Sequence, residues 1–349
     1  MTTASTRCVV PWQLRTRALE LGGRTLVMGV VNVTPDSFSD GGLFFEPEAA
    51  VAHALELLDE GADLLDLGAE STRPGSRAGG VAGCALAPLV SAEEEQARLL
   101  PVLEGILRAR PDAIVSVDTY KAATARAALK AGAEIVNDVS GFAWDEELLP
   151  QPYSERQRIA KANAGPSTPL RSAQDDSIFE ASSIRAGSMA SVCAEFRCGV
   201  VLMHTRGRPE EWGAQPRLEA DEMLATVRAG LVASMEGAAA AGIAMEAIVL
   251  DPGYGFGKRF EENYALLARQ AELLALGRPL LAGVSRKSFL GRTLAPLHGG
   301  SDAPVAARET ASMAALTAAI LHGASIVRVH AARQAVEAAR IADAVLAAG

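Results

Sequence analysis

Aromatic residues are scarce in this chain, at 5% of its 349 residues, although 49% of the residues are hydrophobic. The interior must therefore be built mainly from Ala, Val, Leu and Ile, which fill parallel sheets and the helices that cover them. This balance argues against an all-β protein and favours an α/β fold.

An excess of positive charge is also missing, since 33 Lys and Arg stand against 42 Asp and Glu, for a net charge of -9. Nucleic acid and anionic lipid would repel a surface with this balance. We expect no nucleic-acid partner and no membrane partner, and any anionic substrate must meet a local basic pocket.

Cysteines and long apolar runs are few. Cys8, Cys84, Cys193 and Cys198 have neither metal-ligand spacing nor the density of a secreted disulfide scaffold. The first residues lack a signal-peptide pattern, and no run approaches the roughly 18 apolar residues that can span a bilayer. These absences predict a cytoplasmic protein with free thiols.

Short apolar runs alternate with longer Ala-rich segments, as strands alternate with helices in βα units. The predicted strands are 25–32, 62–68, 113–119, 134–139, 199–204, 247–253, 279–285 and 325–330. The predicted helices are 46–60, 92–109, 121–131, 183–197, 219–241, 262–276, 305–322 and 333–347. Eight rounds predict a single (β/α)8 TIM barrel, which needs about 250 residues plus insertions.

Two segments lie outside this repeat. We expect residues 1–24 to form an N-terminal cap or hairpin at the bottom of the barrel, which then occupies 25–349. The stretch 151–183, after strand four, is rich in Ser, Ala, Gln and Pro without a strong period, which predicts a flexible surface insertion.

Every predicted strand ends in polar or ionisable residues, at the rim where such barrels carry their active sites. These residues are Asn32, Asp66, Asp118, Asn137, Asp138, His204, Asp251, Ser285, Arg286, Lys287, Arg328 and His330. Any one Asp, Asn or Ser could be a helix cap or a turn residue. Lys287, Arg328 and His330 do not fit that explanation, so a shared polar substrate site explains the set better.

The set also divides by charge. Asp118, Asn137 and Asp251 offer acceptors to a flat, donor-rich heterocycle. Arg328 and His330, with Ser71–Arg73 after strand two, offer donors to an anion, and loops seven and eight are the usual phosphate seat of this barrel. The predicted ligand has a heteroaromatic end and a phosphorylated end.

Several motifs together resemble the dihydropteroate synthase family, in that family's order along the chain. The longest are MGVVNVTPDSFSDGG (28–42) and DLGAESTRPGS (66–76), and the others are SVDT (116–119), NDVSG (137–141), LMHTRGRP (202–209), LDPGYGFGK (250–258), GVSRKSFLG (283–291) and RVH (328–330). The resemblance covers about residues 25–345.

This resemblance implies the substrate contacts of the site. The pterin ring would be bound by Asp118, Asn137, Met203, Asp251 and Lys287. The diphosphate would be held by Asn32, Thr72, Arg73, Arg328 and His330. The p-aminobenzoate pocket would be formed by Phe38, Thr72, Arg73, Pro74, Phe256, Ser285 and Lys287.

The resemblance also implies the reaction and its cofactor. Mg²⁺ would sit against Asn32 and Asp40, and the catalytic residues would be Asn32, Asp40, Lys287, Arg328 and His330. The expected reaction joins 6-hydroxymethyl-7,8-dihydropterin diphosphate to p-aminobenzoate with loss of diphosphate by an SN1-like displacement. The family commonly forms homodimers, and the Ala-rich helix at 305–322 suits close helix packing.

Two alternatives remain. A methyltetrahydrofolate:corrinoid methyltransferase would share Asp118, Asn137 and Asp251, but it needs no diphosphate site, so SRKS at 285–288 and RVH at 328–330 count against it. A catalytically silent paralogue that binds a pterin or a partner protein is the second alternative.

Overall fold

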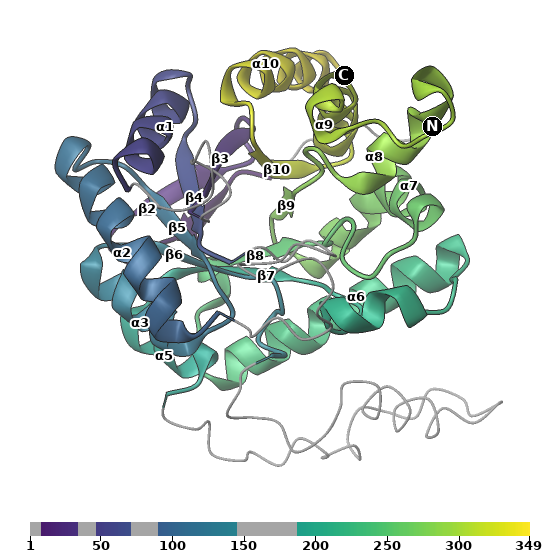
Figure 1. Ribbon diagram of the computed structural model, residues 1–349. Coiled ribbons are helices and arrows are strands. Elements are labelled where there is room, and N and C mark those ends of the chain that lie inside the picture. The colour runs from purple at the N-terminus through teal and green to yellow at the C-terminus, as the bar shows by residue number, and fades with distance from the viewer. Residues whose placement is uncertain (1–7, 34–46, 71–89, 145–186) are drawn as a thin grey trace, which may run out of the picture.

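Eight parallel strands close into one barrel in this computed structural model, which describes residues 8–33, 47–70, 90–144 and 187–349 (Figure 1). The order around the barrel is β10-β3-β4-β5-β6-β7-β8-β9, so the last strand in the chain pairs with the first barrel strand. The strands are β3 Leu26–Asn32, β4 Leu64–Gly68, β5 Val115–Asp118, β6 Ile135–Asp138, β7 Gly199–Met203, β8 Ile248–Asp251, β9 Leu280–Ala282 and β10 Ala324–Val329. All eight lie within the predicted ranges apart from the first residue of β10, and the (β/α)8 fold is confirmed.

Helices surround the barrel and connect successive strands (Figure 1). The α-helices are α1 Pro47–Asp59, α2 Ala92–Ala109, α3 Ala122–Ala131, α5 Met189–Phe196, α6 Ala220–Ala240, α7 Phe260–Arg269, α8 Ser288–Thr293, α9 Glu309–Leu321 and α10 Ala332–Ala348. The 3-10 helices are η2 Pro209–Ala214, η3 Met245–Ala247, η4 Gln270–Leu276, η5 Ala295–His298 and η6 Val305–Ala307.

Several helices differ from the sequence prediction. The helix expected at 305–322 divides into η6 and α9, which begins at Glu309. The helix expected at 183–197 begins at Met189, because Ser188 is its N-cap and accepts a hydrogen bond from the Ser191 amide. The segment expected as one helix at 262–276 divides into α7 and η4 at Gln270. Helix α8 was not predicted, since six residues are too short to show a helical period.

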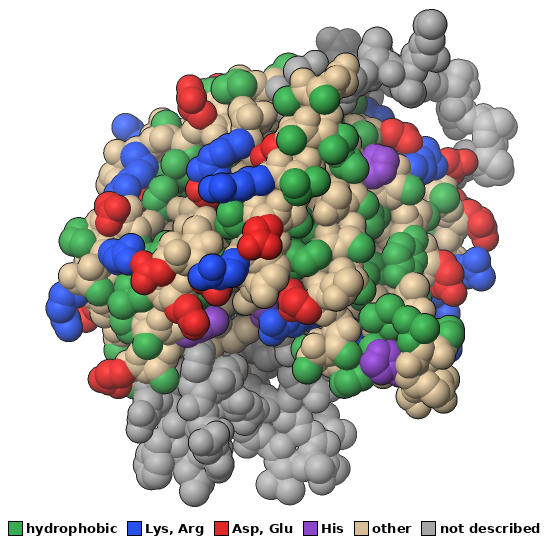
Figure 2. All heavy atoms as spheres, turned by 90° about the horizontal axis from the view of Figure 1, so that it is seen from above, with side chains coloured by type: hydrophobic (Ala, Val, Ile, Leu, Met, Phe, Trp, Pro, Cys, Tyr) green, Lys and Arg blue, Asp and Glu red, His purple; other side chains and the backbone are tan. Residues whose placement is uncertain are grey.

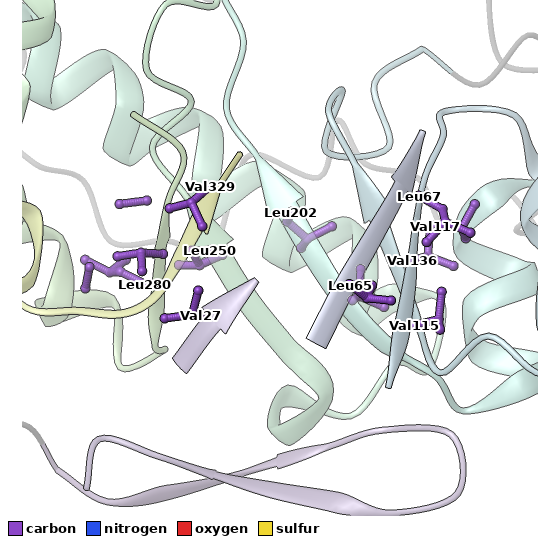
Figure 3. Packing of buried hydrophobic residues seen from close by; sticks show 14 of the residues in the cluster. Val27, Leu65, Leu67, Val115, Val117, Val136, Leu202, Leu250, Leu280 and Val329 are labelled. Atoms are coloured by element: carbon purple, nitrogen blue, oxygen red, sulfur yellow. The ribbon is translucent and has the colours of Figure 1, made fainter. Parts of the chain in front are cut away.

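The barrel strands contribute to two separate cores because successive side chains point to opposite faces of a strand. One set packs outward against the helices and includes Val27, Leu65, Val115, Leu202 and Leu250 (Figure 3). The other set consists of alternate residues near the strand starts: Leu26, Met28, Leu64, Ile114, Ile135, Val201, Val249, Leu281 and Ile326. The lower half of the barrel interior is therefore apolar.

A hairpin covers this apolar end. Strands β1 Val10–Gln13 and β2 Ala18–Leu21 pair antiparallel, and Trp12, Leu14 and Leu21 belong to the same buried cluster as the inward residues of the barrel strands. The Trp12 indole Nε1 donates to the Ala247 carbonyl at 2.8 Å, just before β8 begins. The hairpin thus closes the N-terminal end of the barrel and leaves the opposite rim for ligands.

Toward the carboxyl-terminal rim of the barrel, the inward-facing side chains of the strands are polar. Asp66 follows Leu64 on β4, Asn137 follows Ile135 on β6, and Arg328 follows Ile326 on β10, each two residues along its strand. Since period-two alternation keeps these residues on the inner face, the barrel carries its polar side chains at the carboxyl ends of the strands.

The outer surface carries charges of both signs. On the face shown in Figure 2, Lys and Arg side chains are interspersed with Asp and Glu. Within the described ranges, no helix is both long and apolar enough to cross a membrane.

Candidate active site

Arg328 is the central cation of the rim. Its Nε donates to Asp66 Oδ2 at 2.5 Å, and its Nη2 donates to Asp118 Oδ2 at 2.7 Å. Asn137 Nδ2 also donates to Asp66 Oδ2, at 2.9 Å. Four strands, β4, β5, β6 and β10, thus place one connected polar cluster across the mouth of the barrel.

Asp66 lies at the centre of this cluster. Its side chain is fully buried, and its Oδ1 atom has no hydrogen-bond partner within the described structure. Because a buried carboxylate oxygen ordinarily finds a donor, this atom marks a place where a ligand or water is expected.

Two further carboxyls of the rim have perturbed pKa values. Burial raises the pKa of Asp118 to about 7, while Arg328 opposes the rise and Asp66 adds to it. Burial also raises the pKa of Asp251, while the Gly253 amide and the charge of Lys287 oppose the rise. Both carboxyls would gain from a ligand that brings donors or positive charge.

Aromatic and apolar side chains form one flank of the mouth. Met203, at the end of β7, clusters with Tyr120, Val139 and Trp144, and Phe256 packs against them. The Lys287 ammonium lies 4.0 Å from the centre of the Phe256 ring. A flat ring could pack on this flank while its polar edge meets the carboxyls.

Ser285 and His330 lie together on the adjoining side. Their Oγ and Nδ1 atoms are 3.0 Å apart, joining the end of β9 to the end of β10. Arg286 and Lys287 follow Ser285, and Arg286 has a φ of 58°, which is rare for a residue with a side chain. Ser312 on α9 accepts the Arg286 amide at 2.8 Å, and Glu309 accepts its Nε at 2.9 Å.

The loop after β8 requires glycine where it meets β7. Gly253 has a φ of 71°, and a Cβ atom there would lie 1.9 Å from the carbonyl oxygen of His204. Gly257 has a φ of 69°, and a Cβ there would lie 2.7 Å from Arg206 Cβ. The glycines of the GYGFG segment therefore let Phe256 be held against the neighbouring loop.

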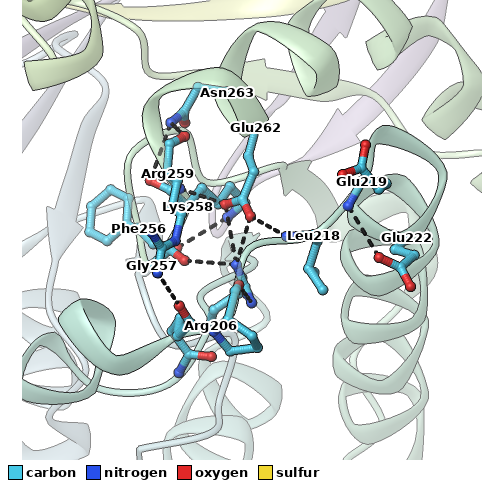
Figure 4. Close-up of polar contacts among 12 residues, drawn as sticks. Arg206, Leu218, Glu219, Glu222, Phe256, Gly257, Lys258, Arg259, Glu262 and Asn263 are labelled. Atoms are coloured by element: carbon cyan, nitrogen blue, oxygen red, sulfur yellow. Dashed lines mark hydrogen bonds and ion pairs between the residues drawn. The ribbon is translucent and has the colours of Figure 1, made fainter.

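A buried ion pair lies next to the loop that follows β8 (Figure 4). Arg206 Nη1 lies 3.2 Å from Glu262 Oε2, and both side chains are almost fully buried. Glu262 also accepts the amides of Leu218 and Arg259 at 2.7 and 2.5 Å. These contacts join the loop after β7 to the first turn of α7.

The structure places the described candidate residues in three adjoining groups. Asn137 and Arg328 both donate to Asp66, and Arg328 also donates to Asp118. Ser285 contacts His330. Lys287 contacts Phe256 and acts electrostatically on Asp251, which pairs in register with Met203. Asn32 is half-buried at the end of β3 and pairs in register with Gly68. The candidates Phe38, Asp40, Thr72, Arg73 and Pro74 lie outside the described residues, and so do the whole 151–183 insertion and residues 71–76 of the DLGAESTRPGS motif.

Sequence reasoning gave no role to several buried polar residues of the site. The sequence indicates that Asp66 orients the loop after strand two, and it indicates no role for Lys258, Arg206 and Glu262. Nor does it indicate one for Lys121, which pairs with Glu70 and lies 3.5 Å from Glu95. The only signal in the sequence was that these charged residues lie within or near the motifs. The residues with which they pair lie far away along the chain. His204, which stood at a strand end, is buried beside Gly230 of α6.

The chain matches the family model described as pterin binding enzyme over residues 28–156 and 175–330. It is 39% identical to the dihydropteroate synthase of Mycobacterium leprae over 327 residues, which cover 93% of this chain and 94% of that protein. The chain belongs to the dihydropteroate synthase family. It is therefore an enzyme of the transferase class, as the motifs predicted.

Solved structures of dihydropteroate synthases agree with this assignment. The Xanthomonas albilineans dihydropteroate synthase with 4-aminobenzoic acid is 36% identical, with a TM-score of 0.72 over 97% of this chain and 99% of that one. The enzyme of the same organism in complex with 7,8-dihydropteroate is 34% identical, with a TM-score of 0.69 over the same shares of both chains. Residues 157–174 fall between the two segments of the pterin binding family match.

Proposed function

We propose that this enzyme condenses 6-hydroxymethyl-7,8-dihydropterin diphosphate with p-aminobenzoate to give 7,8-dihydropteroate and diphosphate. The observation that carries the proposal is the cluster of Asp66, Asp118, Asn137 and Arg328 across one barrel mouth, beside Asp251 and Lys287. It offers acceptors for a donor-rich ring and a cation for an anion within one site.

Asp118, Asn137 and Asp251 are proposed to bind the pterin, with Met203 and Lys287 beside the ring. The raised pKa values of Asp118 and Asp251 mean that their ionised forms gain much from donors or positive charge. In an SN1-like displacement, cleavage of the C–O bond sends the electron pair to the diphosphate and leaves a cation delocalised into the pterin. Nearby carboxylates would stabilise that cation.

Arg328, His330 and Asn32 are proposed to hold the diphosphate, with Thr72 and Arg73. Arg328 extends from β10 beside β3, the strand that ends at Asn32, so both can face the same anion. Departure of the diphosphate increases the negative charge on its oxygens, and a guanidinium placed there stabilises that charge.

Mg²⁺ would be held by the Asn32 amide oxygen, Asp40 and oxygens of the diphosphate. The described residues contain no group of three or more His, Cys, Asp or Glu able to hold a metal ion. The half-buried Asn32 suits an ion that takes many of its ligands from substrate and water, which is usual for Mg²⁺. When bound, the ion would neutralise charge on the leaving group.

The p-aminobenzoate is proposed to lie between Phe256, Lys287 and Ser285, with Phe38, Thr72, Arg73 and Pro74. Its amine attacks the pterin cation, forms the C–N bond and then loses a proton. Since an aniline is a weak nucleophile, orientation should matter more than a strong general base. We expect Phe38→Ala to reduce turnover, and unchanged kinetics in that variant would remove Phe38 from the proposal.

A homodimer is proposed as the assembly. Among the described residues, exposed large apolar side chains recur on α7, η5, η6 and α9, with Phe260, Leu297, Val305 and Leu321 as examples. Helices α7 and α9 contact one another, so a second copy could cover this side. Light scattering after gel filtration tests it, and a monomeric mass would remove it.

The deciding experiment is a diphosphate-release assay with both substrates and Mg²⁺. Product is expected only when all three are present, and Arg328→Met should abolish it without preventing folding. A protein that binds the pterin diphosphate but never releases diphosphate would support the silent paralogue instead. Transfer of a methyl group from methyltetrahydrofolate would support the corrinoid alternative.

A further inference from the structure

Lys258 is a buried lysine at the end of the loop that follows β8, and the proposed reaction gives it no task. Its side chain extends back beneath the loop, and only 7% of the residue is exposed. Its ammonium donates to the carbonyl oxygens of Gly253 at 2.7 Å, His204 at 3.2 Å and Phe256 at 3.3 Å. A lysine ammonium has three donors, so all of them are used.

These three carbonyls connect both sides of the proposed site. Gly253 donates its amide to Asp251 Oδ1 at 2.7 Å, so its position fixes the orientation of that carboxylate. Phe256 carries the ring that contacts Lys287, and its carbonyl also accepts the Arg206 amide at 3.4 Å. His204 directly follows Met203 at the end of β7.

We propose that Lys258 is a positioning residue that sets the Asp251 carboxylate and the Phe256 ring relative to one another through its three carbonyl contacts. The inference rests on the proposed function, because it assigns Asp251 to the pterin and Phe256 to the p-aminobenzoate. Lys258 itself would touch neither substrate. It would keep the subsites at the separation that the C–N bond needs, and geometry of this kind controls rate strongly.

The charge on Lys258 is part of this arrangement. Burying an ammonium is costly unless it is paired and hydrogen-bonded, so an apolar side chain would serve if only volume mattered. Burial lowers the pKa of Lys258 to about 7, while the carboxylates of Asp251 and Glu262 oppose the shift. The charged or titratable groups that act on Lys258 or are acted on by it are Asp251 on β8, Glu262 on α7, and His204, Arg206 and Lys287 on the neighbouring loops.

Loss of one proton would change the contacts as well as the charge. A neutral amine keeps two donors and turns a lone pair toward the third carbonyl, which repels it. An arginine at this position would stay charged throughout. The wild-type loop should therefore loosen as the pH rises through the Lys258 pKa, and that of Lys258→Arg should not.

The test compares Lys258→Met, which keeps length but removes all donors, with Lys258→Arg and with Lys130→Met, which removes an exposed lysine of α3. For each purified enzyme the measurements are kcat, the KM of each substrate from about pH 6 to about pH 9, and hydrogen exchange of the 251–258 amides.

We expect Lys258→Met to raise the KM of p-aminobenzoate by about tenfold or more and to speed exchange of the loop amides by a similar factor, as for a lost charged hydrogen bond. Lys130→Met should match the wild type. The KM of p-aminobenzoate in the wild type should rise above about pH 7, and this rise should be absent in Lys258→Arg.

Three results would overturn the inference. The first is a folded Lys258→Met whose KM values and loop exchange match those of the wild type, and the second is exchange in that variant that is faster by the same factor across the whole chain. The third is a KM of p-aminobenzoate that rises at alkaline pH equally in the wild type and in Lys258→Arg. Should Lys258→Met fail to fold, the pH comparison still decides. Exchange of the loop does not depend on catalysis, so an inactive wild type would count against the proposed function alone.

Discussion

Arg328 on β10 and Asp118 on β5 form an ion pair across the barrel mouth, with Nη2 and Oδ2 2.7 Å apart. The two residues lie 210 positions apart in the chain. Their contact joins the main cation of the proposed diphosphate site directly to a carboxyl group of the proposed pterin site. Binding at one site must therefore alter the electrostatics of the other.

Replacing Arg328 should destabilise the protein as well as inactivate it. Arg328→Met removes the cation that pairs with the fully buried Asp66, and breaking a buried ion pair costs about 3 to 5 kcal/mol. The measurement is the free energy of unfolding in urea. The Asp66→Asn, Arg328→Met double variant should recover part of the loss, and a simple sum of the single effects would contradict the pairing.

Asp118 should make stability and pterin binding depend on pH in opposite directions. Because its pKa rises from 3.8 to about 7 on folding, the folded protein binds more protons in that range, and the stability contributed by this group is lost as pH rises through 7. Ionised Asp118 is the better acceptor, so affinity for a pterin ligand should rise over the same range. Calorimetry at several pH values checks both, and Asp118→Asn should flatten both curves.

Trp12 should matter for stability but not for chemistry. Trp12→Ala removes a fully buried side chain from the closed end of the barrel and should cost about 3 to 5 kcal/mol. Below the unfolding temperature, kcat and both KM values should stay close to those of the wild type. A selective loss of kcat in a well-folded variant would show that the hairpin reaches the site.

Gly253 and Gly242 offer a matched pair of substitutions. Both have positive φ, 71° and 84°, but a Cβ at Gly253 would meet the His204 carbonyl whereas a Cβ at Gly242 would have no heavy atom within 4 Å. Gly242→Ala should cost about 1 to 2 kcal/mol from its backbone alone. Gly253→Ala should cost more and lower activity sharply, and equal effects in thermal unfolding would rule out the steric contact.

The barrel could be predicted from sequence because its signal is local. Each strand is a short apolar run that ends in a polar residue, as in ADLLDLG and AIVLDPG, and these runs contain β4 and β8. Helix α8 was missed because SFLGRT is short and contains a glycine. The division at Gln270 is not evident from the sequence because buried leucines continue across it, from Leu266 and Leu267 in α7 to Leu273 in η4.

The polar contacts of the site were less accessible than its residue types. Strand ends identify Asp118, Asn137 and Arg328 as neighbours, but nothing local indicates that Asp66 joins Asn137 to Arg328. Likewise Arg206 and Glu262 pair although they are 56 positions apart. The position of Lys258 at the end of LDPGYGFGK does not indicate that its side chain is buried. Such pairings depend on the strand register and on the conformation of the loops, and neither can be predicted from a single sequence.

The contact between Trp12 and Ala247 spans 235 positions, and it has a consequence for how the chain reaches its final form. The β1–β2 hairpin precedes every barrel strand in the chain, yet it packs against Val249 of β8 and Ile326 of β10, which are synthesised much later. The hairpin can reach this position only after β10 has been made, so a change in Trp12 fluorescence, measured with Trp144 and Trp212 replaced by Phe, would report a late stage of barrel closure.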